Sequence, residues 1–150
     1  MMRIFDFFDE KDQQLWIERI RNSDWGASDF LAQLLEQGRF FEVLGDGGKM
    51  LIIADDDKIV SFATLAPRDC IDDDSLYPWI GFVFTAPEYR GHRYSGELIE
   101  EACRLAKEQG HEQVYIATGH VGLYEKYGFS YIETRIDIYN EESRIYCRKL

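Results

Sequence analysis

The chain has 150 residues, the usual length of one domain, and 45% of them are hydrophobic, which excludes a disordered or collagen-like protein. Its 17 basic and 28 acidic residues give a formal net charge of −11. This balance argues against nucleic-acid binding, which depends on lysine and arginine contacts to phosphates, and it fits either a cationic partner or simple solubility.

The cysteines and the N-terminus indicate a reducing compartment. The chain has three cysteines, which cannot all pair, and no C-x-x-C motif. The N-terminal residues MMRIFDFFDE lack the basic and apolar regions of a signal peptide, and no apolar run reaches the roughly 20 residues that span a bilayer. We therefore expect one cytoplasmic domain over residues 1–150, with free thiols and no membrane association.

Hydrophobic periodicity predicts the elements of the first half of the chain. In order, these are a strand over residues 3–8, an amphipathic helix over 11–21, a helix from a cap at Ser28 or Asp29 to near Gly38, and a hairpin of MLIIA and KIVSFATL around the turn Asp55–Asp57.

The second half begins with an aspartate-rich loop over Pro67–Pro78. The elements expected after it are the strand WIGFVFT, a helix over Tyr94–Gln109, the strand QVYIAT, a short helix over 121–127, and strands over 130–138 and 143–149. The order β-α-α-β-β-β-α-β-α-β-β predicts an α/β (α+β) fold, with a mixed sheet and helices on its faces.

The segment PEYRGHRYSG, over Pro87–Gly96, joins a predicted strand to a predicted helix. Unpaired backbone N–H groups and the positive end of the helix dipole converge at such a junction, which favours an anion. Arg90, His92 and Arg93 add positive charge there. The alternative is a plain turn with solvated arginines. The chain has neither G-x-x-x-x-G-K-S/T nor G-x-G-x-x-G, so other phosphate-binding motifs are absent.

A second informative segment is GLYEKYGF, over Gly122–Phe129. Tyr124 and Tyr127 are three residues apart, which places them on one face of a short helix. Large aromatic side chains usually pack in a core, and we expect this role for Tyr127.

Together, the segments TAPEYRGHRYSGELIEEA and LYEKYGF resemble two motifs of the GNAT family of N-acetyltransferases. The first corresponds to the family's acetyl-CoA motif R/Q-x-x-G-x-G/A, which follows a strand, and the second to a motif like LYEKxGF before a terminal hairpin. They lie about 30 residues apart with a helix and a strand between them, as in the family. The resemblance covers residues 50–150 and implies a mixed, mostly antiparallel central sheet.

The first motif departs from the family pattern. Arg93 stands where a glycine is usual and Ser95 where glycine or alanine is usual. A glycine lets the backbone approach a pyrophosphate without a Cβ in the way. We expect Arg93 to fit if its φ is negative, with its guanidinium free to contact a phosphate. Thr118, Gly119 and His120 occupy the region where the family frequently has an asparagine.

The resemblance implies transfer of an acetyl group from acetyl-CoA to an amine. It places the stabilisation of the developing oxyanion around Phe82–Thr85 and makes Tyr124 the general acid that protonates the CoA thiolate. The expected cofactor-binding residues are Phe84, Thr85, Arg90, Gly91, His92, Arg93, Tyr94, Ser95 and Gly96. The alternative is a non-catalytic acyl-CoA-binding or regulatory module on the same fold.

The sequence does not identify the general base. The candidates are Asp69, Asp72–Asp74 and His120. The alternative for each is a solvated or structural residue with no catalytic role. On a fold of this family the loop before the central strand borders the acceptor site, so its acids would attract a cationic amine. The acceptor is expected to be a small-molecule or peptide amine. The apolar terminal strands offer a surface for a homodimer.

The sequence predicts no metal site and no nucleophilic cysteine. The three histidines lack an H-x-x-x-H pattern, and the aspartate runs lack the glycine and glutamate of a calcium-binding loop. Cys103 lies on the expected buried face of a helix without an activating partner.

Overall fold

The computed structural model describes all 150 residues, and the strands form one seven-stranded sheet in the order β1-β2-β3-β4-β5-β7-β6. The strands are β1 (Met2–Asp6), β2 (Lys49–Asp55), β3 (Lys58–Ala66), β4 (Trp79–Thr85), β5 (Gln113–Thr118), β6 (Ser130–Ile136) and β7 (Glu142–Lys149). All neighbours are antiparallel except β4 and β5, which are parallel. The predicted mixed, mostly antiparallel sheet is confirmed.

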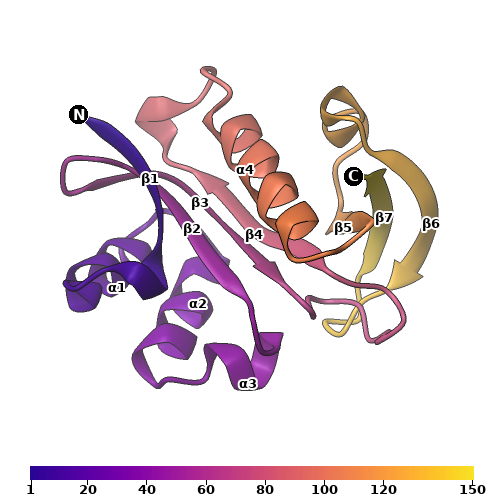
Figure 1. The fold of residues 1–150 in the computed structure, drawn as a ribbon, viewed down its shortest axis with the longest axis horizontal. Coiled ribbons are helices and arrows are strands. Elements are labelled where there is room, and N and C mark those ends of the chain that lie inside the picture. Colours follow the sequence, from indigo (N-terminus) through magenta and orange to yellow (C-terminus); the bar gives the residue numbers. More distant parts are fainter.

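Helices cover both faces of this sheet (Figure 1). The helices are α1 (Gln13–Arg21), α2 (Gly26–Glu36), α3 (Phe40–Leu44) and α4 (Tyr94–Glu108). Single 3-10 turns are η1 (Phe7–Asp9), η2 (Pro87–Tyr89) and η3 (Tyr124–Tyr127). Helices α1 to α3 lie on one face, and α4 crosses the other.

The core has one layer on each side of the sheet because alternate residues of a strand point to opposite faces. On β2, Met50 and Ile52 pack against α1 and α2, whereas Leu51 and Ile53 face α4. Both faces of β2 and β3 are thus buried, so these strands are almost continuously apolar. None of the helices combines the length and the apolar character that crossing a bilayer requires.

The helices of the first half differ from the prediction in two ways. Helix α3 was not predicted, since its five residues are too few to show a helical period. Helix α2 begins at Gly26, before the predicted caps, and its N-cap residue Trp25 makes no side-chain hydrogen bond to the helix. Ser28 is buried inside the first turn instead of capping it.

Candidate active site

The parallel strands β4 and β5 pair over only two residue positions and then separate. Trp79 pairs with Tyr115 and Ile80 with Ile116, and no pair follows. Strand β5 stays paired with β7 as far as Thr118. Figure 1 shows the resulting division of the sheet into β1–β4 on one side and β5, β7 and β6 on the other. A wedge between β4 and β5 therefore opens from Gly81 onward.

Strand β4 carries a β-bulge at the start of this wedge. Thr64 pairs with Gly81 and Phe62 with Phe84, so Phe82 and Val83 together face the single residue Ala63. Phe82 has φ +50°, a left-handed conformation that is rare for an aromatic residue. Strain of this kind costs on the order of 1–3 kcal/mol and is concentrated at functional sites. The bulge frees backbone polar groups of β4 from the β3 ladder.

Helix α4 starts at the far end of β4, after the turn that the sequence singled out. No side chain caps its N-terminus, and Gly91 precedes it with φ +86°. The backbone N–H groups of the first turn therefore have no hydrogen-bond partner within the helix. They lie at its N-terminus, which is the positive end of the helix dipole. This arrangement can bind a phosphate.

Arg93 corrects the expected geometry of this turn. Its φ is +62°, not negative, and it occupies the N-cap position in the left-handed conformation. A glycine adopts this conformation without the Cβ penalty, which explains why glycine suits the position. The backbone of the turn thus has the conformation typical of glycine, although residue 93 is an arginine. The Arg93 side chain is exposed to solvent.

Replacing Arg93 by glycine should raise the free energy of unfolding by roughly 0.5–1 kcal/mol, because the left-handed penalty exceeds the added chain entropy. Urea or thermal unfolding measures this change. His92→Gly is the matched control, since His92 lies in the same turn without a positive φ, and it should not stabilise the protein. Equal effects of the two substitutions would contradict the strain at Arg93.

The other expected cofactor-binding residues lie along the same segment. The Arg90 Nε donates a hydrogen bond to the Thr85 carbonyl at 3.0 Å, which closes the turn between β4 and α4. The Thr85 hydroxyl lies 3.0 Å from that of Ser61, and the Phe84 ring packs in the core beside α1 and α2. Phe84 and Thr85 lie beyond the last pair of β4 with β5, so their backbone is not paired with β5, whereas Gly91 to Gly96 surround the helix N-terminus.

Gly96 and Tyr127 show why the second aromatic of LYEKYGF is a packing residue. A Cβ at Gly96 would come within 2.6 Å of the Tyr127 ring, so helix α4 and the turn η3 meet there without space for a side chain. The Tyr127 carbonyl also accepts a hydrogen bond from Arg148. These contacts fix η3, and with it Tyr124, against the start of α4.

Tyr124 lies on the α4 side of the sheet and is 6% exposed. Its ring is 6.2 Å from Phe129 and 6.4 Å from Tyr146 between centroids. Burial, followed by the neighbouring Tyr127, raises the pKa of Tyr124 to about 12, and no hydrogen bond contributes to this shift. The phenol therefore keeps its proton at neutral pH and is free to donate it.

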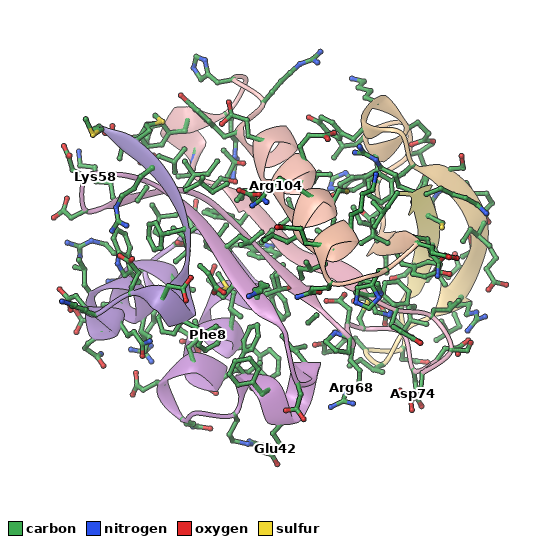
Figure 2. All side chains as sticks on the ribbon, viewed as in Figure 1. Phe8, Glu42, Lys58, Arg68, Asp74 and Arg104 are labelled. Carbon is green, nitrogen blue, oxygen red and sulfur yellow. The ribbon has the colours of Figure 1, made fainter.

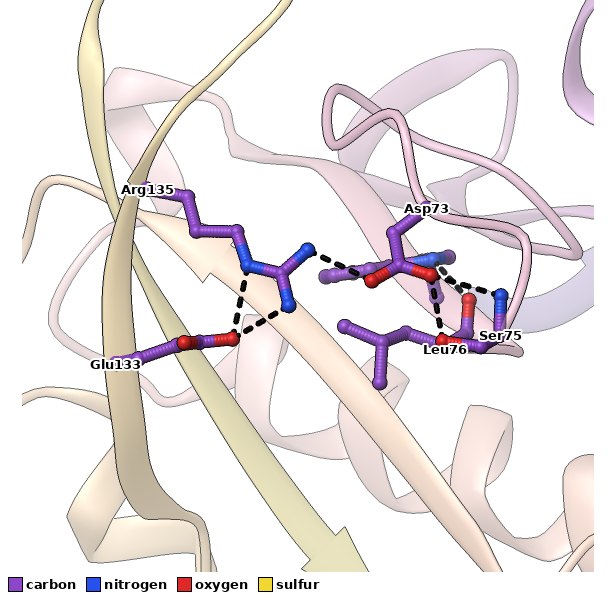
Figure 3. A network of polar contacts seen from close by, with 6 residues as sticks. Asp73, Ser75, Leu76, Glu133 and Arg135 are labelled. Carbon is purple, nitrogen blue, oxygen red and sulfur yellow. Dashed lines mark hydrogen bonds and ion pairs between the residues drawn. The ribbon is translucent and has the colours of Figure 1, made fainter.

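The structure separates the candidate bases of the β3–β4 loop. Asp73 accepts hydrogen bonds from Ser75 and pairs with Arg135 of β6 at 2.7 Å (Figure 3). These contacts lower the pKa of Asp73 to about 2, so it is a poor base. Asp72 and Asp74 are exposed, and Figure 2 shows Asp74 pointing away from the body of the molecule. His120 is exposed as well.

Asp69 differs from its neighbours because its carboxylate lies against the backbone of β4. A Cβ at Gly81 would collide with the Asp69 Oδ1, so the carboxylate can occupy this position only because residue 81 is a glycine. Burial raises the pKa of Asp69 to about 6, opposed by hydrogen bonding to Cys70, and no cation contributes. The adjacent Arg68 is bound to the carbonyls of Glu42 and Val43. Asp69 is thus an unpaired carboxylate beside the bulge, with a pKa suited to a general base.

Asp69 opens into a cavity of about 660 Å³ on the face of the sheet that α1 to α3 cover. Apolar side chains dominate its walls, which consist of Trp25, Gly26, Ala27, Phe30, Val43, Leu44, Asp69, Cys70, Phe82, Asp137, Ile138 and Tyr139. The backbone N–H of Ile138 donates to the Cys70 carbonyl at 2.9 Å and joins the β6–β7 turn to the β3–β4 loop. Phe82 lines the cavity and also lies on β4 just after its last pair with β5, so the cavity and the wedge meet at this residue.

The buried thiols do not supply a nucleophile. Burial raises the pKa of Cys70 to about 12 and that of Cys103 to about 11, so both stay thiols at neutral pH and are poor nucleophiles. No three His, Cys, Asp or Glu side chains come together as metal ligands would.

Comparison with solved structures identifies the class of fold. A GNAT-family protein from Desulfovibrio desulfuricans superposes with a TM-score of 0.71 at 14% identity, over 99% of each chain. A GNAT acetyltransferase from Elizabethkingia anophelis, solved with acetyl-CoA, has a TM-score of 0.70 at 15% identity, over 99% of this chain and 98% of the other. An aminoglycoside 6′-N-acetyltransferase, solved with coenzyme A, gives 0.68 at 11%, over 99% and 96%.

A model of the acetyltransferase (GNAT) family matches residues 10–129. The chain therefore belongs to the GNAT family of acetyltransferases, as the two sequence motifs indicated. Among curated proteins, none matches this sequence.

Proposed function

We propose that the chain is an N-acetyltransferase, one domain over residues 1–150, which transfers an acetyl group from acetyl-CoA to a primary amine by direct attack. The observation that carries this proposal is the wedge between β4 and β5. On its α4 side lie an uncapped helix N-terminus and the buried phenol of Tyr124. On its other side lies the unpaired carboxylate of Asp69, inside a cavity.

The N-terminus of α4 fits the pyrophosphate of acetyl-CoA. The backbone N–H groups from Gly91 to Gly96 would hold it, with positive charge from Arg90, His92 and Arg93 nearby. The backbone of Phe84 and Thr85 would face the cofactor where β4 leaves β5. GNAT structures solved with acetyl-CoA or coenzyme A share this fold, which supports the choice of cofactor.

The residues on the two sides of the wedge would divide the chemistry. Asp69 would accept the proton of the ammonium, and the amine nitrogen would then form a bond to the thioester carbonyl carbon as the carbon–sulfur bond breaks. Backbone N–H groups freed by the bulge at Phe82 would stabilise the negative charge that develops on the carbonyl oxygen. Tyr124 would donate its proton to the leaving sulfur and recover one from the nitrogen of the new amide through water, while Asp69 would release the first proton to solvent.

The walls of the cavity assist the proton transfer to Asp69. An apolar environment disfavours charge, so it raises the pKa of a carboxylic acid and lowers that of an ammonium group. The two pKa values therefore move toward each other, and the unfavourable transfer from an amine of pKa near 10 to a carboxylate becomes smaller than in water.

Two measurements test the proposal against a non-catalytic acyl-CoA-binding module. Acetyl-CoA at about 100 times its Kd should raise the Tm by about 5–10 °C, because it binds only the folded state. Isotopically labelled acetyl-CoA should then transfer its label to an amine, detected by mass spectrometry. A raised Tm without labelled amine would favour the binding module, and an unchanged Tm at millimolar ligand would contradict both.

Two further expectations stay predictions. The edge strand β6 exposes Ile132 and Ile136, and a homodimer would bury these side chains. The cytoplasmic location also stays a prediction.

A further inference from the structure

We infer that the acceptor is a monoamine whose amino group is carried by a compact apolar body, preferably an aromatic one. This inference rests on the proposed function and specifies its substrate class. The cavity volume of about 660 Å³ lies within the range of small-molecule sites, roughly 300–1,000 Å³. Shape alone would admit many amines, so the choice among them depends on the chemistry of the walls.

Three aromatic rings, those of Trp25, Phe30 and Phe82, form part of the cavity wall. The Phe30 and Phe82 rings are 6.3 Å apart and nearly parallel, and Trp25 meets Phe82 edge-on, also at 6.3 Å. Trp25 is 37% and Phe30 42% exposed, so part of each ring is accessible to a ligand. An apolar group that entered the cavity would remove these surfaces from water and pack against the rings.

The cavity has two carboxylates, of which Asp69 is the one that a ligand can best reach as a hydrogen-bond acceptor. Asp69 has no cationic neighbour, whereas both carboxylate oxygens of Asp137 are used inside the β6–β7 turn. The Asp137 Oδ1 accepts from the N–H groups of Tyr139 and Glu141, and its Oδ2 accepts from the Ser143 hydroxyl at 2.8 Å. No lysine, arginine or histidine lines the cavity. One ammonium group therefore has Asp69 as its partner, and any further one would meet only apolar walls or a carboxylate whose oxygens already accept three hydrogen bonds.

This charge distribution discriminates between classes of amine. A polyamine or an aminoglycoside would place extra ammonium groups against apolar walls, where an unpaired charge is costly. An α-amino acid would bring a carboxylate next to Asp69 without a cation to balance it. Some structural neighbours are aminoglycoside acetyltransferases, but the cavity of this chain favours a monoamine.

The positions of the groups also fix the orientation of the acceptor. Asp69 lies against the buried Gly81 beside the wedge, while Trp25, Phe30 and the largely exposed Tyr139 lie toward solvent. The amino group would therefore sit deepest, next to the reaction site, and the apolar body would extend between the rings.

The test compares kcat/KM for phenethylamine, spermidine and phenylalanine with acetyl-CoA as donor. Phenethylamine should exceed each of the others by at least about tenfold, since misplaced charge and lost apolar contact each reduce binding in the transition state. Preference for spermidine or phenylalanine, or equal rates, would overturn the inference and leave the proposed function standing.

Binding without turnover separates the two proposals. Trp25 is the one partly exposed tryptophan, since Trp16 and Trp79 are buried, so phenethylamine should change the tryptophan fluorescence. A saturable change for phenethylamine and not for spermidine supports the inference even if no acetyl group is transferred, an outcome that would contradict the proposed function. No change with any of the three amines would overturn the inference.

A substitution at the aromatic wall gives a matched pair of variants. Phe30→Glu should lower kcat/KM for phenethylamine by about tenfold or more and raise that for spermidine, because it adds an anion at the mouth of the cavity. Phe41→Glu makes the same substitution at an exposed phenylalanine of α3 that does not line the cavity, and should change both values by less than about twofold. Equal effects of the two variants would overturn the inference.

Discussion

Replacing Asp69 by asparagine should lower kcat at pH 7 by about 10²–10⁴-fold, which is the usual contribution of a general base. Asparagine has nearly the same shape as aspartate and keeps the contact with Gly81, but it cannot accept the proton of the ammonium. Acetyl-CoA binding should be nearly unchanged, because Asp69 lies on the face of the sheet opposite α4. Steady-state kinetics and calorimetric titration with acetyl-CoA measure the two effects.

The same substitution should stabilise the fold. The pKa of Asp69 is about 6 in the folded state, above its ordinary 3.8, so the native chain binds this proton more tightly than the unfolded chain does. Stability from this group is therefore present below pH 4 and is lost as the pH rises through 6. The neutral asparagine side chain would avoid the cost of the buried charge, and the free energy of unfolding at pH 7–8 should rise by about 1–2 kcal/mol.

Asp74→Asn is the matched control for both measurements. It lies five positions along the same loop, is exposed, and has no resolved contact to the cavity. It should leave kcat and stability nearly unchanged. A loss of stability in Asp69→Asn together with a small change in kcat would show that Asp69 has a structural role, and would contradict the assignment.

Tyr124→Phe has the second largest expected effect, a fall in kcat of about 10²-fold at nearly constant affinity for acetyl-CoA. The phenol would no longer protonate the leaving thiolate, while the aromatic ring would keep its contacts with Phe129 and Tyr146. Because the pKa of Tyr124 is raised to about 12, ionisation of this group should not reduce the rate below that pH. Stability should change little, since no hydrogen bond holds the phenol.

Tyr131→Phe controls for the loss of a phenol elsewhere. Tyr131 lies on β6, where its hydroxyl is 2.7 Å from that of Thr134, and the variant should retain kcat within about twofold. A similar decrease in both variants would contradict a specific role for Tyr124. A Tyr124→Phe enzyme with unchanged kcat would also do so.

The strands and the long helix could be predicted from the sequence because each has a strong local pattern. The strand Trp79–Thr85 and the start of α4 at Tyr94 agree with the expected positions. The segment Phe40–Leu44 could not be predicted, since one turn of apolar residues has no measurable period. The sequence shows that Arg93 replaces the glycine that is usual in the motif. It does not show the sign of its φ, which depends on the path of the whole turn.

The general base and the acceptor cavity could not be identified from local sequence patterns. Asp69 and Asp73 look alike in the sequence, and what separates them is tertiary: Asp73 pairs with Arg135, 62 residues away, whereas Asp69 meets the glycine of β4. The cavity brings Trp25 together with Tyr139, from opposite ends of the chain. No periodicity connects such residues, so only the fold reveals the site.

The pH dependence of kcat/KM for a monoamine, measured in the native protein and in Asp69→Asn, tests the central claim most directly. With Asp69 as base, kcat/KM of the native protein should rise with pH until about 6 and then level off through the neutral range. The variant depends on amine that is already deprotonated in solution, so its kcat/KM should keep rising toward the amine pKa near 10, and its deficit should shrink. Parallel profiles with a constant ratio would contradict the account.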